Sequence, residues 1–328
     1  MPAFKFTKVN PGDVLTIDYD LSSIGKFAKI KEAILSAGIT GTWSSDYKKF
    51  TVNTISGNST IDLIVNKYGV DINFSSLSLN DTFFLGKYQV GSETTWDIEW
   101  EIVHQESDYQ IAMTKQIIDV RCFDAKEPTN TDTNRKKYGN NNWQYSNIEQ
   151  WLNSDQASWY SAQHQYDAPP SSANVWNNYN PYDTHKGFLY HWNEDEKKLL
   201  KDMTLTLANN TVTDGGGSYT WTGKVFLPTY TQMGFGQNNN IAEGVQFSKF
   251  TDNASRIKSI NKYCAENNKY CIDNNKTEGT NWYYWMSSVA SSNSIGVRYV
   301  DGGGLGSNDI AYYGKYGLAP CICLPRKS

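Results

Sequence analysis

The sequence predicts an α+β protein built from two parts. Short runs rich in Tyr, Val, Trp and Ile alternate with clusters of Ser, Asn, Asp and Gly, which is typical of strands joined by turns. A few segments instead carry apolar residues at helical spacing. At about residue 80, closely spaced elements give way to strands separated by long polar loops. We therefore expect a small α+β domain at residues 1–79 and a larger domain at residues 80–328.

The first part contains one expected helix among expected strands. Residues 13–19, 49–55 and 60–65 show the alternation of strands, and a turn at residues 56–59 joins the last two. Between them, residues 23–37 fit an amphipathic helix. The apolar face of this helix would consist of Ile24, Phe27, Ile30, Ile34 and Leu35. Such a unit can attach the protein to a larger assembly, or it can be an ordinary packing subdomain.

The second part contains two expected helices, at Ser146–Asn153 and Glu194–Asp202. The latter follows Asn193, a good N-cap residue, and has Glu196 at its third position, so the two can form a capping box. Two long loops rich in Asn, Pro and Ser are expected at residues 127–142 and 163–182. Loops of this length are usually functional or disordered, so they are candidates for a binding role.

The C-terminal strands carry a family resemblance. Residues 281–288 read Asn-Trp-Tyr-Tyr-Trp-Met-Ser-Ser, residues 296–304 read Gly-Val-Arg-Tyr-Val-Asp-Gly-Gly-Gly, and residues 316–324 read Tyr-Gly-Leu-Ala-Pro-Cys-Ile-Cys-Leu. These segments resemble the closing motifs of the DUF6273 family. The sequence departs from the family pattern at two places: it reads Leu318-Ala319-Pro320 where the family usually has Arg before the closing Pro, and Met286 replaces the usual Leu.

The resemblance extends upstream to about residue 80. Residues 80–88 and 98–103 resemble the opening strands of the family, residues 145–153 its helix, and residues 225–229 a later strand. It implies a C-type-lectin-like fold, related to the formylglycine-generating enzymes, with a twisted antiparallel sheet, two short helices and long loops. In that fold the segments at 83–88 and 319–324 would pair.

Composition excludes several classes of function. The chain has 34 acidic and 30 basic residues, a net charge of −4 and no basic cluster, so we expect no nucleic-acid partner. No run approaches the roughly twenty apolar residues of a membrane span, so we expect no membrane insertion. The first residues lack the apolar core of a signal peptide, which predicts synthesis and retention in a cytoplasm until assembly or lysis.

We find no catalytic, cofactor or metal signature. The four histidines lie in no metal-binding spacing, and no nucleophile elbow or P-loop is present. Cys264 and Cys271 bracket an expected polar loop, and Cys321 and Cys323 share a strand. A zinc site is therefore left open, but buried free thiols explain these cysteines more simply. The formylglycine-generating enzymes use cysteines for oxidation, but few basic residues lie near these cysteines in the sequence to lower the pKa of their thiols. The sequence carries only imperfect versions of the calcium-binding signatures of C-type lectins.

The C-terminal loops instead have the composition of a recognition surface. Aromatic residues make up 14 % of the chain, with 22 Tyr and 11 Trp, and the loops add small polar residues that adapt hydrogen bonds. The candidate ligand-binding residues are Ser292, Asn293, Ser294, Tyr299, Asp301, Ser307, Asn308, Asp309, Tyr312, Tyr313 and Lys315. More than half of the tryptophans should be core, and Trp282, Trp285, Met286, Val297, Val300, Leu318 and Leu324 should join them. A solvated rim without function is the alternative, but exposed tyrosine pairs favour recognition.

These observations predict a non-enzymatic receptor-binding protein of a phage tail tip, located in the virion and made in the host cytoplasm. Its expected partners are a bacterial cell-surface protein or glycan, other tail proteins and further copies of the chain in a homo-oligomer such as a trimer. The alternative is a bacterial protein of the same fold, in the cytoplasm or at the cell surface, that binds a ligand through loops diversified by a retroelement. A third class is an enzyme of the formylglycine-generating type.

Overall fold

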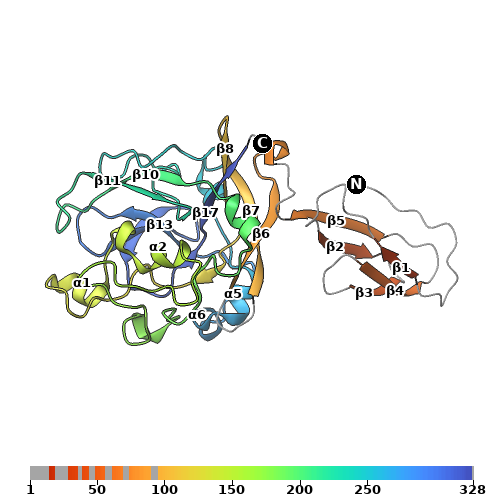
Figure 1. Cartoon of the computed structure of the whole chain (residues 1–328), viewed down its shortest axis with the longest axis horizontal. Coiled ribbons are helices and arrows are strands. Elements are labelled where there is room, and N and C mark those ends of the chain that lie inside the picture. The colour runs from red at the N-terminus through yellow and green to blue at the C-terminus, as the bar shows by residue number, and fades with distance from the viewer. Residues whose placement is uncertain are drawn as a thin grey trace. The chain divides into compact units, whose positions relative to one another are not determined.

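The computed structural model describes residues 15–18, 29–35, 39–43, 49–55, 61–68, 74–89 and 95–326 (Figure 1). The protein is mixed α+β and mostly strands, which confirms the predicted class. Contacts within the chain divide it into an N-terminal unit, residues 1–73 with Thr82–Leu85, and a C-terminal unit, Phe74–Asp81 with residues 86–328. Among the described residues no helix is long and apolar enough to cross a membrane.

The N-terminal unit is built from strands in the segments that the structure describes. Strands β1 (Leu15–Asp18), β4 (Lys49–Ile55) and β3 (Ile39–Trp43) form an antiparallel sheet in that order. Strand β2 (Lys29–Leu35) pairs with β5 (Ile61–Tyr68). The strands expected at 13–19, 49–55 and 60–65 are therefore present, whereas the turn expected at 56–59 lies outside the described residues.

The helix predicted at residues 23–37 is wrong where the structure describes it. Residues 29–35 are strand β2 and pair in antiparallel fashion with β5. The segment reads Lys-Ile-Lys-Glu-Ala-Ile-Leu, whose β-branched residues suit a strand as well as one face of a helix. Pairing with β5 supplies the hydrogen bonds that decide between the two, because tertiary context overrides a weak local propensity. The described part of this unit is thus all β, and the expected α+β character is not found there.

Two sheets dominate the C-terminal unit. In the first sheet, β12 (Val225–Phe226), β17 (Cys321–Pro325), β8 (Tyr109–Thr114) and β7 (Thr95–Gln105) lie side by side in this order. They are followed by β6 (Thr82–Gln89), of which residues 86–89 belong to the C-terminal unit. The second has the order β15 (Gly306–Ile310), β14 (Gly296–Val300), β13 (Tyr284–Val289), β16 (Gly317–Leu318) and β9 (Asp119–Val120). Strands β10 (Met203–Ala208) and β11 (Ser218–Gly223) form a separate hairpin.

The chain passes from the second sheet to the first near its end. The sequence suggested one closing strand, but β16 pairs with β13 and β9, and β17 pairs with β8 and β12. Pro320 lies between β16 and β17 and has no backbone N–H that could donate a hydrogen bond to a neighbouring strand. Strands β6 and β17 share a sheet but are separated by β7 and β8, so the expected direct pairing of residues 83–88 with 319–324 is wrong.

Short helices connect these strands. They are α1 (Thr133–Tyr138), α2 (Asn147–Leu152), α3 (Glu194–Lys198), α4 (Asn253–Arg256), α5 (Lys262–Asn267) and α6 (Lys269–Asp273), with 3-10 turns η1 (Phe74–Ser76), η2 (Trp143–Tyr145) and η3 (Trp176–Asn178). The two predicted helices are α2 and α3, and the capping box of Asn193 and Glu196 is formed. The stretch between Cys264 and Cys271, expected to be a loop, lies mostly in α5 and α6, and the loop expected at 127–142 contains α1.

The core of the C-terminal unit is rich in tryptophan. Seven of the eleven tryptophans are buried, as predicted: Trp100, Trp143, Trp151, Trp159, Trp192, Trp221 and Trp285. Six of the seven individual core assignments are confirmed, because Trp285, Met286, Val297, Val300, Leu318 and Leu324 have no exposed surface. Trp282 is the exception, since its ring is half-buried at the surface.

Candidate functional site

A chain of neighbouring rings lies at the surface of the C-terminal unit. We name it the aromatic cluster and define it as Trp176, Tyr179, Tyr270, Trp282, Tyr283, Tyr299, Tyr313 and Tyr316. Successive ring centroids are 4.7 to 6.2 Å apart, within the range of edge-to-face and offset contacts. Tyr283 is 37 % exposed and most of the others are half-buried, so the cluster presents ring surface to solvent.

Distant segments meet in this cluster. Trp176 belongs to η3 and Tyr270 to α6, while Tyr299 belongs to β14 of the second sheet. The Trp176 ring lies 5.4 Å from that of Tyr313, and 6.5 Å from that of Tyr270. The sheet therefore supplies the rigid part of the surface, and the loop at residues 163–182 covers one side of it.

Lysines lie over the rings of the cluster. The ammonium of Lys276 is 4.1 Å from the ring centre of Trp282, and that of Lys315 is 4.8 Å from Tyr313. Such cation–π contacts are worth about 0.5–1 kcal/mol each at exposed sites. The combination of flat apolar ring faces, phenolic hydroxyls and ammonium groups can stack on a ligand and hydrogen-bond its polar edges.

Several of the predicted ligand-binding residues lie in or beside the cluster. Tyr299 and Tyr313 belong to it, and Lys315 lies over its rings. The Tyr312 ring lies 5.3 Å from Tyr313 and 5.6 Å from Tyr138. Strand β15 contains Ser307, Asn308 and Asp309 at the edge of the second sheet, and Asn308 is exposed.

The remaining predicted residues have local structural partners. Ser294 has no exposed surface, and its hydroxyl lies 3.3 Å from an Asp132 carboxylate oxygen, so it cannot contact a ligand in this conformation. Asn293 accepts hydrogen bonds from the backbone of the loop before β14, and Asp301 accepts from Gly303 and Leu305 in the turn after β14. Asp301 thus lies at the opposite end of β14 from the loop that holds exposed Ser292.

An open groove of about 470 Å³ adjoins Tyr312. Its lining consists of Lys126, Pro128, Lys136, Lys137, Tyr138 and Tyr312. No carboxylate lines this groove among the described residues, so it is locally positive although the whole chain is negative. We refer to it as the lysine groove.

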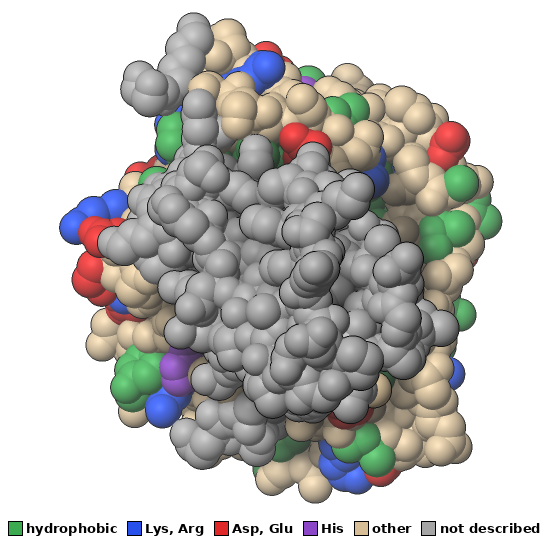
Figure 2. All heavy atoms as spheres, turned by 90° about the vertical axis from the view of Figure 1, so that its right-hand side faces the viewer, with side chains coloured by type: hydrophobic (Ala, Val, Ile, Leu, Met, Phe, Trp, Pro, Cys, Tyr) green, Lys and Arg blue, Asp and Glu red, His purple; other side chains and the backbone are tan. Residues whose placement is uncertain are grey.

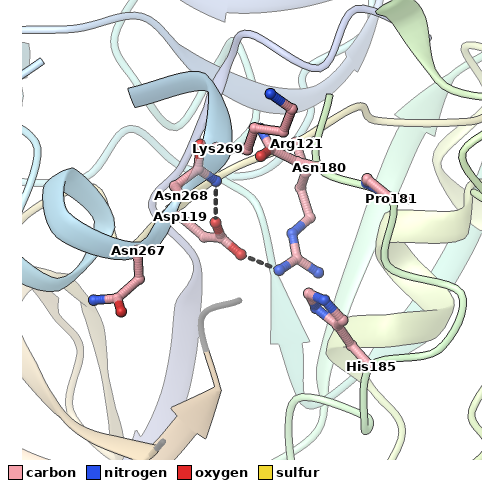
Figure 3. A pocket seen from close by; sticks show the side chains of 8 residues that line it. All are labelled: Asp119, Arg121, Asn180, Pro181, His185, Asn267, Asn268 and Lys269. Atoms are coloured by element: carbon pink, nitrogen blue, oxygen red, sulfur yellow. Dashed lines mark hydrogen bonds and ion pairs between the residues drawn. The ribbon is translucent and has the colours of Figure 1, made fainter. Parts of the chain in front are cut away.

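A smaller pocket of about 210 Å³ lies where β9 ends (Figure 3). We name it the Arg121 pocket; its lining residues are Asp119, Arg121, Asn180, Pro181, His185, Asn267, Asn268 and Lys269. Figure 3 shows the guanidinium of Arg121 and the ring of His185 pointing toward each other across it. Asn180 and Lys269 directly neighbour Tyr179 and Tyr270 in the sequence, so the pocket lies beside the aromatic cluster.

Arg121 is held rigidly in this pocket. Only 1 % of the residue is exposed, and its guanidinium carbon lies 4.0 Å from the ring centre of Trp151 and 4.5 Å from that of Tyr182. One nitrogen, Nη2, forms an ion pair with Asp119, whose carboxylate also accepts a 2.7 Å bond from Asn268. Burial, and next the positive charge of Arg121, lower the pKa of His185 to about 4, so this imidazole is neutral at pH 7.

Burial makes the described cysteines poor nucleophiles. All five are free thiols, with no disulfide, which agrees with the prediction of buried free cysteines. The Cys264 and Cys271 sulfurs are 3.7 Å apart in the interior. Desolvation raises the pKa of Cys323 to about 11 and that of Cys321 further above its ordinary value. The described residues contain no group of three or more His, Cys, Asp or Glu that could hold a metal ion.

Sequence reasoning missed part of the surface. Trp176 and Tyr179 lie in the long loop that the sequence marked as a candidate for binding, so loop length was a usable signal. Tyr270 and Tyr283 gave no such signal, because only the fold brings Tyr270 of α6 next to Trp282, just before the start of β13. Arg121 is a single basic residue in an apolar stretch, and its pocket is formed by three separate segments, residues 119–121, 180–185 and 267–269.

The surface seen in Figure 2 carries lysines and arginines interspersed with aspartates and glutamates.

In a comparison with known proteins, the family model for the domain of unknown function DUF6273 matches residues 109–326. No curated protein and no solved structure matched the chain significantly.

Proposed function

The chain belongs to the DUF6273 family, and we propose that it is a receptor-binding protein of a phage tail tip. In this proposal the C-terminal unit has a C-type-lectin-like fold and recognises a ligand on the bacterial surface. The observation that carries the proposal is the aromatic cluster, whose rings come from five separate segments and lie beneath lysine side chains.

The energetics of recognition support this use of the cluster. Binding energy at interfaces concentrates in a few aromatic and arginine side chains, with polar neighbours that tune specificity. A folded protein normally buries large aromatic rings, so a contiguous patch of rings that stays exposed to solvent marks an interaction site. Tyr283, Trp176 and Tyr313 offer such surface, and the exposed residues of β15 provide polar groups beside it. A glycan or a protein loop could both meet these demands.

A non-enzymatic role fits the chemistry of the thiols. An oxidative reaction of the formylglycine-generating type needs a reactive thiolate. Cys321 has no exposed surface and Cys323 is 2 % exposed, and burial raises the pKa of both. These thiols would be almost entirely protonated at pH 7, which makes the enzyme the least supported of the three candidates.

A second candidate is a bacterial ligand-binding protein of the same fold that is diversified by a retroelement. The specific observation in its favour is that Ser292 in a loop and Asn308 on the edge strand β15 are exposed, at positions where substitution costs little stability. In either case the N-terminal unit would attach the protein to its assembly. The partners in that assembly would be other tail proteins, or further copies of the chain in a trimer.

Adsorption of the purified, fluorescently labelled protein to a panel of bacterial strains tests the proposal. We expect saturable binding to some strains and a loss of at least tenfold in affinity for Tyr283→Ala, since hot-spot rings contribute about 2 kcal/mol or more. Tyr190→Ala removes a ring of similar exposure, 39 %, outside the cluster and is the matched control. Equal affinity of both variants and the parent would overturn the role of the cluster.

A further inference from the structure

Arg121 is an unusual buried cation because most of its donors have no protein partner. A guanidinium carries five N–H donors, and the ion pair with Asp119 uses those on Nη2 only. Nε and Nη1 are buried and have no hydrogen-bond partner among the described residues. A buried donor without a partner costs about 1–3 kcal/mol, more in a charged group, so these atoms call for an acceptor in the pocket.

No other residue of the lining accepts a hydrogen bond from Nε or Nη1 of Arg121 among the described residues. The Asn268 side chain is fully used, donating to Asp119 and Val120 and accepting from the first turn of α6. Asn180 accepts from Tyr270 and donates to Gly314. His185 Nδ1 has no partner among the described residues. The charged groups that line the pocket are Arg121, Lys269 and Asp119, and the ammonium of Lys269 also pairs with Asp273 outside the lining.

Size and position restrict the occupant further. The volume of about 210 Å³ is below the roughly 300–1,000 Å³ of pockets for drug-sized ligands, so the pocket suits one small unit. The backbone N–H of Tyr270 donates to Asn180 at 3.4 Å, so a ring of the aromatic cluster is fixed directly to the wall. A ligand lying on the cluster can therefore place one terminal group in the pocket.

We infer that the Arg121 pocket binds the anionic group, a carboxylate or a phosphate, of a sugar unit in the ligand that the aromatic cluster recognises. The group accepts hydrogen bonds from Nε and Nη1 of Arg121, and Lys269 lies at the mouth. This inference rests on the proposed function for the origin of the ligand. The binding of the small anionic unit itself is measurable without that function.

Thermal unfolding of the full chain with added sodium glucuronate, sodium phosphate or glucose tests the inference. We expect glucuronate or phosphate to raise the Tm by about 3 °C at ten times its Kd, by mass action on the folded state. Glucose has the same ring without the charge and should give little shift. Sodium chloride at equal ionic strength measures the general salt effect, and shifts no larger than this effect would overturn the inference.

Variants locate the anion. Lys269→Glu reverses the charge at the mouth and should abolish the shift, whereas Lys262→Glu makes the same change on exposed α5, away from the pocket lining, and should retain it. His185→Asp places a carboxylate opposite Arg121; it should raise the Tm without ligand and remove the response to glucuronate and phosphate. Replacing Arg121 itself would leave Asp119 buried and unpaired, so it is not a clean test.

The outcomes separate the two proposals. If Lys136→Glu with Lys137→Glu removes the shift and Lys269→Glu does not, the anion binds in the lysine groove and the inference is wrong. If no anion binds but Tyr283→Ala still loses adsorption to bacteria, the proposed function stands without the pocket. If anions bind as expected but no variant of the cluster changes adsorption, the pocket stands and the recognition surface lies elsewhere.

Discussion

The ring centres of Trp285 and Tyr316 lie 4.1 Å apart, and this contact joins the buried sheet to the aromatic cluster. Trp285 has no exposed surface, and its indole N–H donates to the backbone oxygen of Arg121 at 3.1 Å. The backbone N–H of Arg121 in turn donates to the oxygen of Tyr316. One buried tryptophan therefore positions both the rings of the cluster and the start of the Arg121 pocket, which couples the two candidate binding elements.

Removing the Tyr316 hydroxyl should test how strongly the cluster is fixed. This hydroxyl donates to Asp309, and only 3 % of Tyr316 is exposed. Tyr316→Phe keeps the ring against Trp285 but loses a bond to a charged group, so we expect about 1.5–3 kcal/mol less stability in urea unfolding. Tyr313→Phe is the control, because the Tyr313 hydroxyl makes no hydrogen bond among the described residues, and it should change stability by less than about 0.5 kcal/mol.

Replacing Tyr312 and Tyr313 together by Ala should weaken adsorption to bacteria. The two rings flank the cluster and the lysine groove, and their loss should cost at least about 2 kcal/mol of binding. Contacts with Tyr138 and Trp176 mean that the fold also loses some packing. Circular dichroism must show an intact fold; unchanged adsorption in that case would place recognition elsewhere, first in the loop at residues 163–182.

The sequence predicted the elements of the C-terminal unit better than their pairing. Alternation and turn chemistry located β13 and β14, and a capping box located α3, because these signals are local. The division of the last strand at Pro320 was not predicted, although proline is a local signal, because the alternation on either side suggested one strand. The helix expected at residues 23–37 failed because a strand partner far along the chain decided its conformation.

The candidate site was predictable only where it is continuous in sequence. Tyr299, Tyr313 and Lys315 were chosen for their place beside turns, and the structure brings them to one surface. Ser294 satisfied the same criteria but is buried, since composition cannot say which side of a loop faces the interior. The Arg121 pocket depends on long-range packing of Trp151 and Tyr182, which no spacing in the sequence reveals.

A methyl group at Gly86 should disturb the packing of β6 against Trp192, which lies just before α3. Gly86 has φ +70°, a left-handed conformation that favours glycine, and a Cβ there would overlap the indole of Trp192. We expect Gly86→Ala to cost about 2–4 kcal/mol, the sum of backbone strain and overpacking. Gly236→Ala has a similar φ of +89° but open space around it, so it isolates the backbone cost. Equal losses in chemical unfolding would mean that the Trp192 ring moves aside freely.

Glu149 should make stability depend on pH. It lies on α2 and accepts bonds from Trp221 Nε1 at 3.0 Å and Asn153 Nδ2 at 3.1 Å. Burial raises its pKa from the ordinary value of 4.5 to about 7, against the opposing effect of these hydrogen bonds. The folded state thus holds a proton that the unfolded chain releases, so the stabilisation is complete below pH 4.5 and is lost as the pH rises to 7.

Glu149→Gln keeps a neutral side chain of the same shape at every pH. Relative to the parent, its free energy of unfolding should therefore increase by up to about 3 kcal/mol between pH 4.5 and pH 7.5, because each pKa unit corresponds to about 1.4 kcal/mol. Urea unfolding at several pH values in this range gives the difference directly. Glu194→Gln, at an exposed position on α3, controls for the loss of one negative charge. A constant difference between Glu149→Gln and the parent across the range would show that Glu149 binds its proton equally in the folded and unfolded chains.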